Sequence, residues 1–272
     1  MAAIALLVVV AIAAFLWWFF QDDAPDEVNL EAAAAQVLDD DTATEPADTD
    51  APAEPATTEA DATTEGDATG SSATTEDTTP AETPAAGGDL SGTWGVDTTI
   101  GEFSYEDSTG TFVGFRVAEE LAGIGAVDAV GRTPVVSGTM TIDGSTLTAV
   151  AIEADMSAIT TDDSRRDGAV REALDTATHP TATFTLGAPV ELGEAALAGE
   201  PIIVDAPGEL TVKGVTQSVV FPLQAQYVGD TIVVVGQLEV VFADYGVSVP
   251  TAPIVLSAED RGPIELQLFF TR

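Results

Sequence analysis

The 272-residue sequence predicts a domain of antiparallel β-strands with one helix, preceded by an apolar segment and an acidic linker. Three observations support this expectation. Residues 1–20 carry no charged side chain, residues 22–89 carry 20 of the 46 acidic residues and no Lys or Arg, and apolar residues recur at alternate positions after Asp89. We therefore expect a transmembrane anchor over residues 1–20, a disordered linker over residues 21–90 and one domain over residues 91–272.

The first 20 residues, MAAIALLVVVAIAAFLWWFF, have the length and composition of a transmembrane helix. A rise of about 1.5 Å per residue spans the roughly 30 Å of hydrocarbon in a bilayer. The aromatic end followed by Asp22 and Asp23 is typical of a membrane–water interface. A cleaved signal peptide is the alternative, but bulky apolar residues follow Ala14 where a cleavage site would need small ones. We expect a single-pass anchor in the cytoplasmic membrane, with the domain on the extracytoplasmic side.

The segment from Asp22 to Asp89 consists mainly of Ala, Thr, Asp, Glu and Pro, with few large apolar residues. Such a composition buries too little surface to offset the entropy of ordering, so we expect disorder. Only Glu31–Leu38 has a helical composition, and so short a segment does not form a stable helix in isolation. The linker is therefore expected to act as a tether between the membrane and the domain.

Several segments of the domain place apolar residues at every second position, which is typical of strands with one buried face. These segments are residues 136–142, 150–156, 182–186, 210–212, 219–225, 238–242 and 264–270. Turn signals such as Asp143-Gly144 and Gly229-Asp230 separate them. Many short antiparallel strands with one apolar face form a sandwich or a barrel. Periodicity does not distinguish a filled interior from a cavity.

One segment has helical instead of alternating spacing. Residues 161–164, Thr-Asp-Asp-Ser, supply the N-cap candidates, and apolar residues then recur at helical intervals at Ala169, Val170, Ala173 and Leu174. We expect a helix of about three turns near residues 164–176, with its apolar side against the strands.

The charge and composition exclude several classes of function. A net charge of −38 argues against binding to nucleic acid or to anionic headgroups. The absence of cysteine excludes thiolate ligands, and the single histidine, His179, excludes a multi-histidine metal site within one chain. The strongest catalytic candidates are the charged residues among positions 162–167, but helix capping and salt bridges account for them. We therefore predict no catalytic residue and no metal site, and a structural role for His179.

Six short motifs occur in order along the domain. They are WGVD at residues 94–97, SAITT at 157–161, RRD at 165–167, HPTATF at 179–184, LTVKGVTQSV at 210–219 and DYGV at 244–247. In this combination the domain resembles the YceI-like family, whose members bind polyisoprenoid lipids. The resemblance covers about residues 91–272 and implies an antiparallel lipocalin-like barrel of about eight strands with a tunnel inside. Residues 119–134 and 175–178 depart from the family pattern, so an entrance built there is expected to differ in shape.

The resemblance implies a binding protein that carries, stores or sequesters a polyprenyl lipid or an isoprenoid quinone. The expected wall of the binding site consists of Phe115, Val117, Met140, Ile152, Met156, Phe184, Leu186, Phe221, Leu223, Leu238, Val240 and Phe242. The headgroup is expected at the mouth beside the helix at Ser164. The alternative is a non-catalytic cell-envelope scaffold or stress-related interaction protein with a filled barrel core. Either protein would be a monomer or a homodimer.

Overall fold

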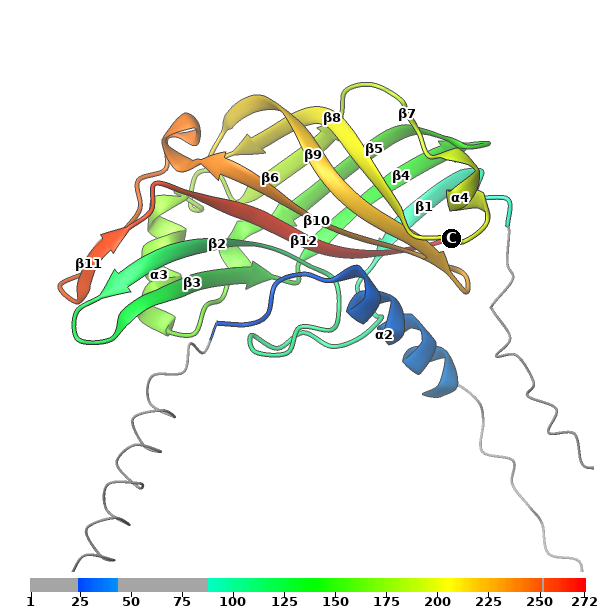
Figure 1. Ribbon diagram of the computed structural model, residues 1–272. Coiled ribbons are helices and arrows are strands. Elements are labelled where there is room, and N and C mark those ends of the chain that lie inside the picture. The colour runs from blue at the N-terminus through cyan, green and yellow to red at the C-terminus, as the bar shows by residue number, and fades with distance from the viewer. Residues whose placement is uncertain (1–23, 44–87, 251) are drawn as a thin grey trace, which may run out of the picture.

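The computed structural model describes residues 24–43, 88–250 and 252–272. These residues include an eight-stranded antiparallel barrel with additional strands and helices around it (Figure 1). The barrel strands, in the order in which they pair, are β1 (Gly92–Asp97), β4 (Val136–Asp143), β5 (Thr146–Asp155), β6 (Thr181–Leu186), β8 (Ile202–Val212), β9 (Val215–Val228), β10 (Thr231–Val241) and β12 (Arg261–Thr271). The pairing of β12 with β1, in which Val96 lies opposite Phe270, closes the barrel. The predicted barrel of about eight strands is confirmed.

Additional elements extend the barrel at its two ends. At one end, β2 (Phe112–Leu121) takes the place of β1 beside β12 and also pairs with β3 (Gly125–Thr133) and β11 (Val255–Ala258). The opposite end carries β7 (Val190–Glu191) and α4 (Gly193–Leu197) (Figure 1). The 3₁₀ turns η1 (Met156–Ala158) and η2 (Phe242–Tyr245) follow β5 and β10.

The predicted helix is α3 (Ser164–Ala173), which lies at the end of the barrel extended by β2 (Figure 1). The side chain of Asp163 caps it by accepting a hydrogen bond from the backbone N–H of Arg165 at 2.7 Å. Val170 is buried, as the helical spacing requires, in the main core cluster, which also contains Trp94, Met140, Ile159 and Phe270. Hydrogen-bonded turns follow the helix, so it ends slightly before the predicted boundary. Below, this end of the barrel is called the α3 end.

His179 packs against the tight turn between β8 and β9. Lys213 and Gly214 form this turn with φ angles of 50° and 73°, which are typical of a type I′ hairpin. A Cβ atom added to Gly214 would lie 2.6 Å from the imidazole of His179. The close contact supports the structural role that we predicted for the histidine.

The expectation of a disordered linker was wrong for residues 24–43. Residues 30–43 form α2 (Leu30–Ala43), which packs against the outside of the barrel (Figure 1). The Oδ1 atom of Asn29 accepts a hydrogen bond from the backbone N–H of Ala32 at 3.1 Å and thereby caps the helix. The rest of the expected linker and the expected membrane anchor lie outside the described residues.

Burial of one apolar face explains why α2 is ordered. Leu30, Ala33 and Val37 lie on the same side of the helix and are buried. They form a cluster with Ile100, Val233, Val235 and Phe269 on the barrel. Such tertiary packing stabilises a helix that would not persist in isolation.

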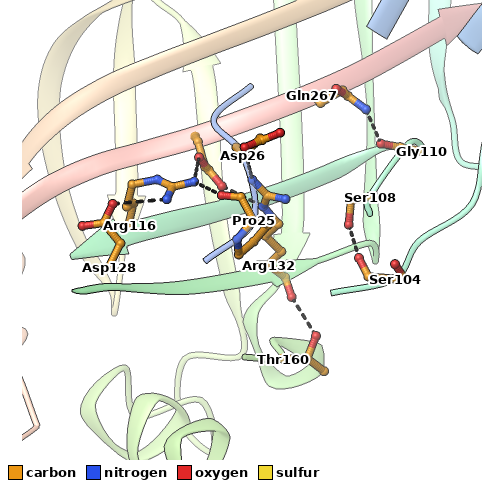
Figure 2. A network of polar contacts seen from close by, with 11 residues as sticks. Pro25, Asp26, Ser104, Ser108, Gly110, Arg116, Asp128, Arg132, Thr160 and Gln267 are labelled. Carbon is orange, nitrogen blue, oxygen red and sulfur yellow. Dashed lines mark hydrogen bonds and ion pairs between the residues drawn. The ribbon is translucent and has the colours of Figure 1, made fainter. Parts of the chain in front are cut away.

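Two buried arginines hold the chain that leads into α2 (Figure 2). Nη2 of Arg116 donates to the carbonyl of Pro25 at 2.6 Å, and Nη2 of Arg132 donates to the carbonyl of Asp26 at 2.7 Å. Glu265, which is 0% exposed, lies between the two arginines. Its Oε1 atom accepts from Nε of Arg132 at 2.7 Å, and its Oε2 atom is 3.7 Å from Nη2 of Arg116. The chain before α2 is thus tied to the barrel through buried charges.

Candidate functional site

The interior of the barrel holds an apolar cavity of about 530 Å³. Alternate residues of each strand point inward, so the strands together supply most of its wall. The cavity extends from α3 and the loop at Ala252 to α4 and Leu90 at the other end. Its volume lies in the range of about 300–1,000 Å³ that is usual for small-molecule sites. A cavity of this size argues against the filled core that strand periodicity left open.

Ten of the twelve residues expected in the wall of the binding site line this cavity. They are Phe115, Val117, Met140, Ile152, Met156, Phe184, Phe221, Leu223, Val240 and Phe242. The other two residues do not: Leu186 packs against the main core cluster, and Leu238 packs against a second cluster that contains Leu210 and Tyr245. That the ten residues contact a ligand stays a prediction.

Two features of the cavity wall were not predicted from the sequence. The first is the contribution of α3 and of the loop near Pro250, which together cover the α3 end of the cavity. The second is a set of small strand residues, Ala154, Ala182 and Ala206, which leave space where larger side chains would fill the interior. The helical spacing in α3 indicated that its apolar side needs a surface to cover. No local sequence signal indicates that a loop folds over a barrel end.

Polar side chains gather at the α3 end of the cavity. Glu119 reaches the cavity from β2, and Asp163, Arg165 and Arg166 reach it from the start of α3. Arg166 forms an ion pair with Asp162 and a second one with Glu119, in which Nη2 and Oε2 are 3.6 Å apart. Asp163 caps the helix. Capping and ion pairing therefore occupy most of these groups, in agreement with a structural role for the charges at the start of α3.

Glu119 is the most buried of these polar groups, because only 9% of its side chain is exposed. Burial raises the pKa of Glu119 above its ordinary value of 4.5; the nearby charge of Arg166 lowers it by less, and Asp162 adds to the rise. Within the part of the chain that the structure describes, no group donates a hydrogen bond to the Oε2 atom of Glu119. The folded state therefore disfavours the ionised form of this carboxyl group.

This shift predicts a pH-dependent effect of Glu119→Gln on stability. Because the pKa is higher in the folded state than in the unfolded chain, ionisation of Glu119 destabilises the fold. The penalty is absent below the ordinary pKa of 4.5 and is complete once the pH exceeds the raised value. We expect the variant to have a higher Tm than the unmodified chain at about pH 7, and the difference to vanish at about pH 3.5. Glu120→Gln, on the exposed face of the same strand, should show no such pH-dependent difference. A lower Tm for Glu119→Gln at neutral pH, measured by thermal melts, would contradict the prediction.

Comparison with known protein families identifies the domain. The sequence profile of the YceI-like domain matches residues 105–270, which is more than half of the chain. The curated proteins contain no match to the chain.

Solved structures also match the chain. A polyisoprenoid binding domain from Saccharophagus degradans implicated in plant cell wall breakdown is 22% identical, with 65% of this chain and 97% of that chain covered and a TM-score of 0.49. BcnA from Burkholderia cenocepacia is 19% identical, with 58% and 95% covered and a TM-score of 0.46. The YceI protein of Campylobacter jejuni is 16% identical, with 51% and 82% covered and a TM-score of 0.41. On the match to the family profile, which covers most of the barrel, the chain belongs to the YceI-like domain family.

Proposed function

We propose that the protein is a membrane-anchored, extracytoplasmic binding protein that holds an isoprenoid lipid or an isoprenoid quinone inside its barrel. The observation that carries the proposal is the apolar cavity of about 530 Å³, which runs between the two ends of the barrel. An elongated apolar interior suits a long hydrocarbon chain better than a compact polar metabolite. The ligand class is the one named for the domain from Saccharophagus degradans.

The energetics of burial are sufficient for such a ligand. Each buried methylene contributes about 0.8 kcal/mol, so a five-carbon isoprene unit contributes about 4 kcal/mol. Association costs an estimated 4–15 kcal/mol in lost freedom of motion. Four isoprene units therefore offset roughly the upper end of that cost without any charged partner.

The membrane anchor at residues 1–20 is part of the same proposal. Within the described parts of the chain, no helix combines the length and the apolar character needed to cross a bilayer, and residues 1–20 lie outside them. The five residues that follow Phe20 end at Pro25, whose carbonyl is held by Arg116, and they reach at most about 17 Å. With this anchor the barrel would lie beside the membrane instead of at the end of a long tether. Cleavage of the chain within residues 44–87 when protease is added to intact spheroplasts, measured by denaturing gel electrophoresis, would support the orientation, and protection until lysis would contradict it.

Filling the cavity tests the binding proposal. We expect Leu223→Trp to reduce the isoprenoid lipid that copurifies with the full chain from host membranes by at least about tenfold, a loss of about 1.4 kcal/mol or more in binding. The introduced ring occupies space in the cavity and costs about 1–3 kcal/mol of stability through overpacking. Organic extraction followed by mass spectrometry measures the retained lipid, and urea unfolding measures the stability.

Val220→Trp is the matched control, because Val220 lies on the same strand and is 54% exposed on the outside. It should retain as much lipid as the unmodified chain. If the unmodified chain yields no stoichiometric lipid, or if Leu223→Trp retains all of it, the binding proposal is wrong.

A further inference from the structure

The α3 end of the cavity contains a buried hydrogen-bond acceptor to which none of the described residues donates. Phe115, Val117 and Glu119 follow one another on the inward face of β2, so the carboxyl group continues the apolar wall toward the mouth. The side chain of Glu119 is 9% exposed, and no group in residues 24–43, 88–250 or 252–272 donates a hydrogen bond to its Oε2 atom. Nη2 of Arg166 lies 3.6 Å from this Oε2 atom, which is beyond good hydrogen-bond distance.

An acceptor in this position is unusual without a binding partner. Buried polar atoms in native proteins nearly always have a hydrogen-bond partner, because an unsatisfied one retains its full desolvation penalty. The Oε2 atom belongs to a residue of the cavity wall, at the end where a polar headgroup would lie if the chain of the ligand fills the apolar interior. A ligand hydroxyl at this end would supply the missing donor.

The surrounding charges disfavour an anionic headgroup. Arg166 already forms ion pairs with Asp162 and Glu119, so these carboxyl groups neutralise its positive charge. Arg165 also lines the cavity, but its side chain is exposed, and its attraction is screened by water and salt. With Asp163 included, three carboxyl groups face two guanidinium groups. A phosphate would therefore meet a neutral or negative environment, within a protein of net charge −38.

We infer that the cavity selects prenyl lipids with an uncharged hydroxyl headgroup over the corresponding phosphates, and that Glu119 determines this specificity by accepting a hydrogen bond that the ligand hydroxyl donates. The inference rests on the proposed isoprenoid binding and adds the chemistry of the headgroup and the residue that recognises it. Burial of Glu119 and the resulting rise in its pKa agree with a site that favours neutral groups.

Competition between two probes of equal chain length tests the inference. The full chain, stripped of lipid in detergent, is incubated with equimolar geranylgeraniol and geranylgeranyl phosphate, and native mass spectrometry measures the two bound species. We expect the alcohol-bound form to exceed the phosphate-bound form by at least about tenfold, because a site with a buried acceptor rejects a ligand that cannot satisfy it. In Glu119→Gln, which removes the negative charge and introduces N–H donors, the ratio should fall below about threefold.

Glu120→Gln removes the same charge from the neighbouring, exposed position and should leave the ratio unchanged. The Tm of each variant, measured in parallel, distinguishes a change in specificity from a loss of folding. A wild-type preference for the phosphate, or an unchanged ratio in Glu119→Gln, would overturn the specificity while leaving isoprenoid binding intact. Failure of both probes to bind the unmodified chain would overturn the proposed function as well.

Discussion

Replacement of Glu265 by Gln is expected to lower the free energy of unfolding by about 3–5 kcal/mol, the usual cost of breaking a buried ion pair. Glu265 is fully buried between Arg116 and Arg132, which are 7% and 3% exposed. The amide would preserve the shape of the side chain but remove the charge that compensates the two guanidinium groups. The carboxylate of Asp128 would stay 3.3 Å from Nη1 of Arg116, but it is partly exposed. The arginines would therefore be buried with too little negative charge.

Urea unfolding followed by circular dichroism measures this loss. Glu239→Gln on the neighbouring strand β10 is the control, because Glu239 is exposed, and its effect should stay within about 0.5 kcal/mol. A similar small effect for both variants would show that the buried charges around Glu265 contribute little to stability.

The second large effect is expected on the outer face of the barrel, where Ala33→Glu should cost about 2–4 kcal/mol. Ala33 is 1% exposed and lies in the cluster that α2 forms with Val233, Val235 and Phe269. A glutamate there must either bury an unpaired charge or separate the helix from the barrel, and separation exposes the apolar residues on β10 and β12. Chemical denaturation measures the change in stability, and hydrogen exchange of the α2 amides reports the separation.

Ala35→Glu provides a matched control, because it makes the same substitution on the exposed side of the same helix. Helix propensity changes equally in both variants, so the difference between them isolates the contact with the barrel. If Ala33→Glu and Ala35→Glu have the same stability and the same amide protection in α2, the contact contributes nothing measurable.

The barrel was predictable because apolar residues alternate with polar ones within single strands. In β12, Ile264, Leu266, Leu268 and Phe270 alternate with other residues, and all four line the cavity. The position of α3 was predictable for a similar reason, since Asp163 caps the helix and Val170 is buried at helical spacing. In both cases the signal lies within a short stretch of the chain.

The docking of α2 was missed because its signal is divided between distant segments. Its own apolar face is small, and the acidic composition around it suggested disorder. The complementary signal lies in β10, where Ile232, Val233, Val234 and Val235 are all buried and alternation is lost. A strand with apolar residues on both faces needs cover on both, and Val233 and Val235 face outward toward α2. The identity of that cover could not be read from β10 alone.

The cavity could not be predicted from periodicity, because filled and hollow barrels share the same alternation. What separates them is the total volume of the inward side chains, which depends on residues such as Ala154 and Ala206 that carry no pattern of their own. The carboxyl group of Glu119 was missed for a related reason. Glu119 occupies an inward position of β2, but a search for alternating apolar residues does not include a charged residue.

The attachment of α2 also changes what a break in the acidic segment would do. Residues 44–87 connect Ala43, the last residue of α2, to Gly88. The segments on both sides pack on the barrel, through α2 and through Leu90. A single cut between them would leave residues 1–43 bound to residues 88–272 through α2 and through the carbonyls of Pro25 and Asp26. The two pieces would then separate only when the helix is displaced, so proteolysis in this segment would nick the protein without shedding the barrel.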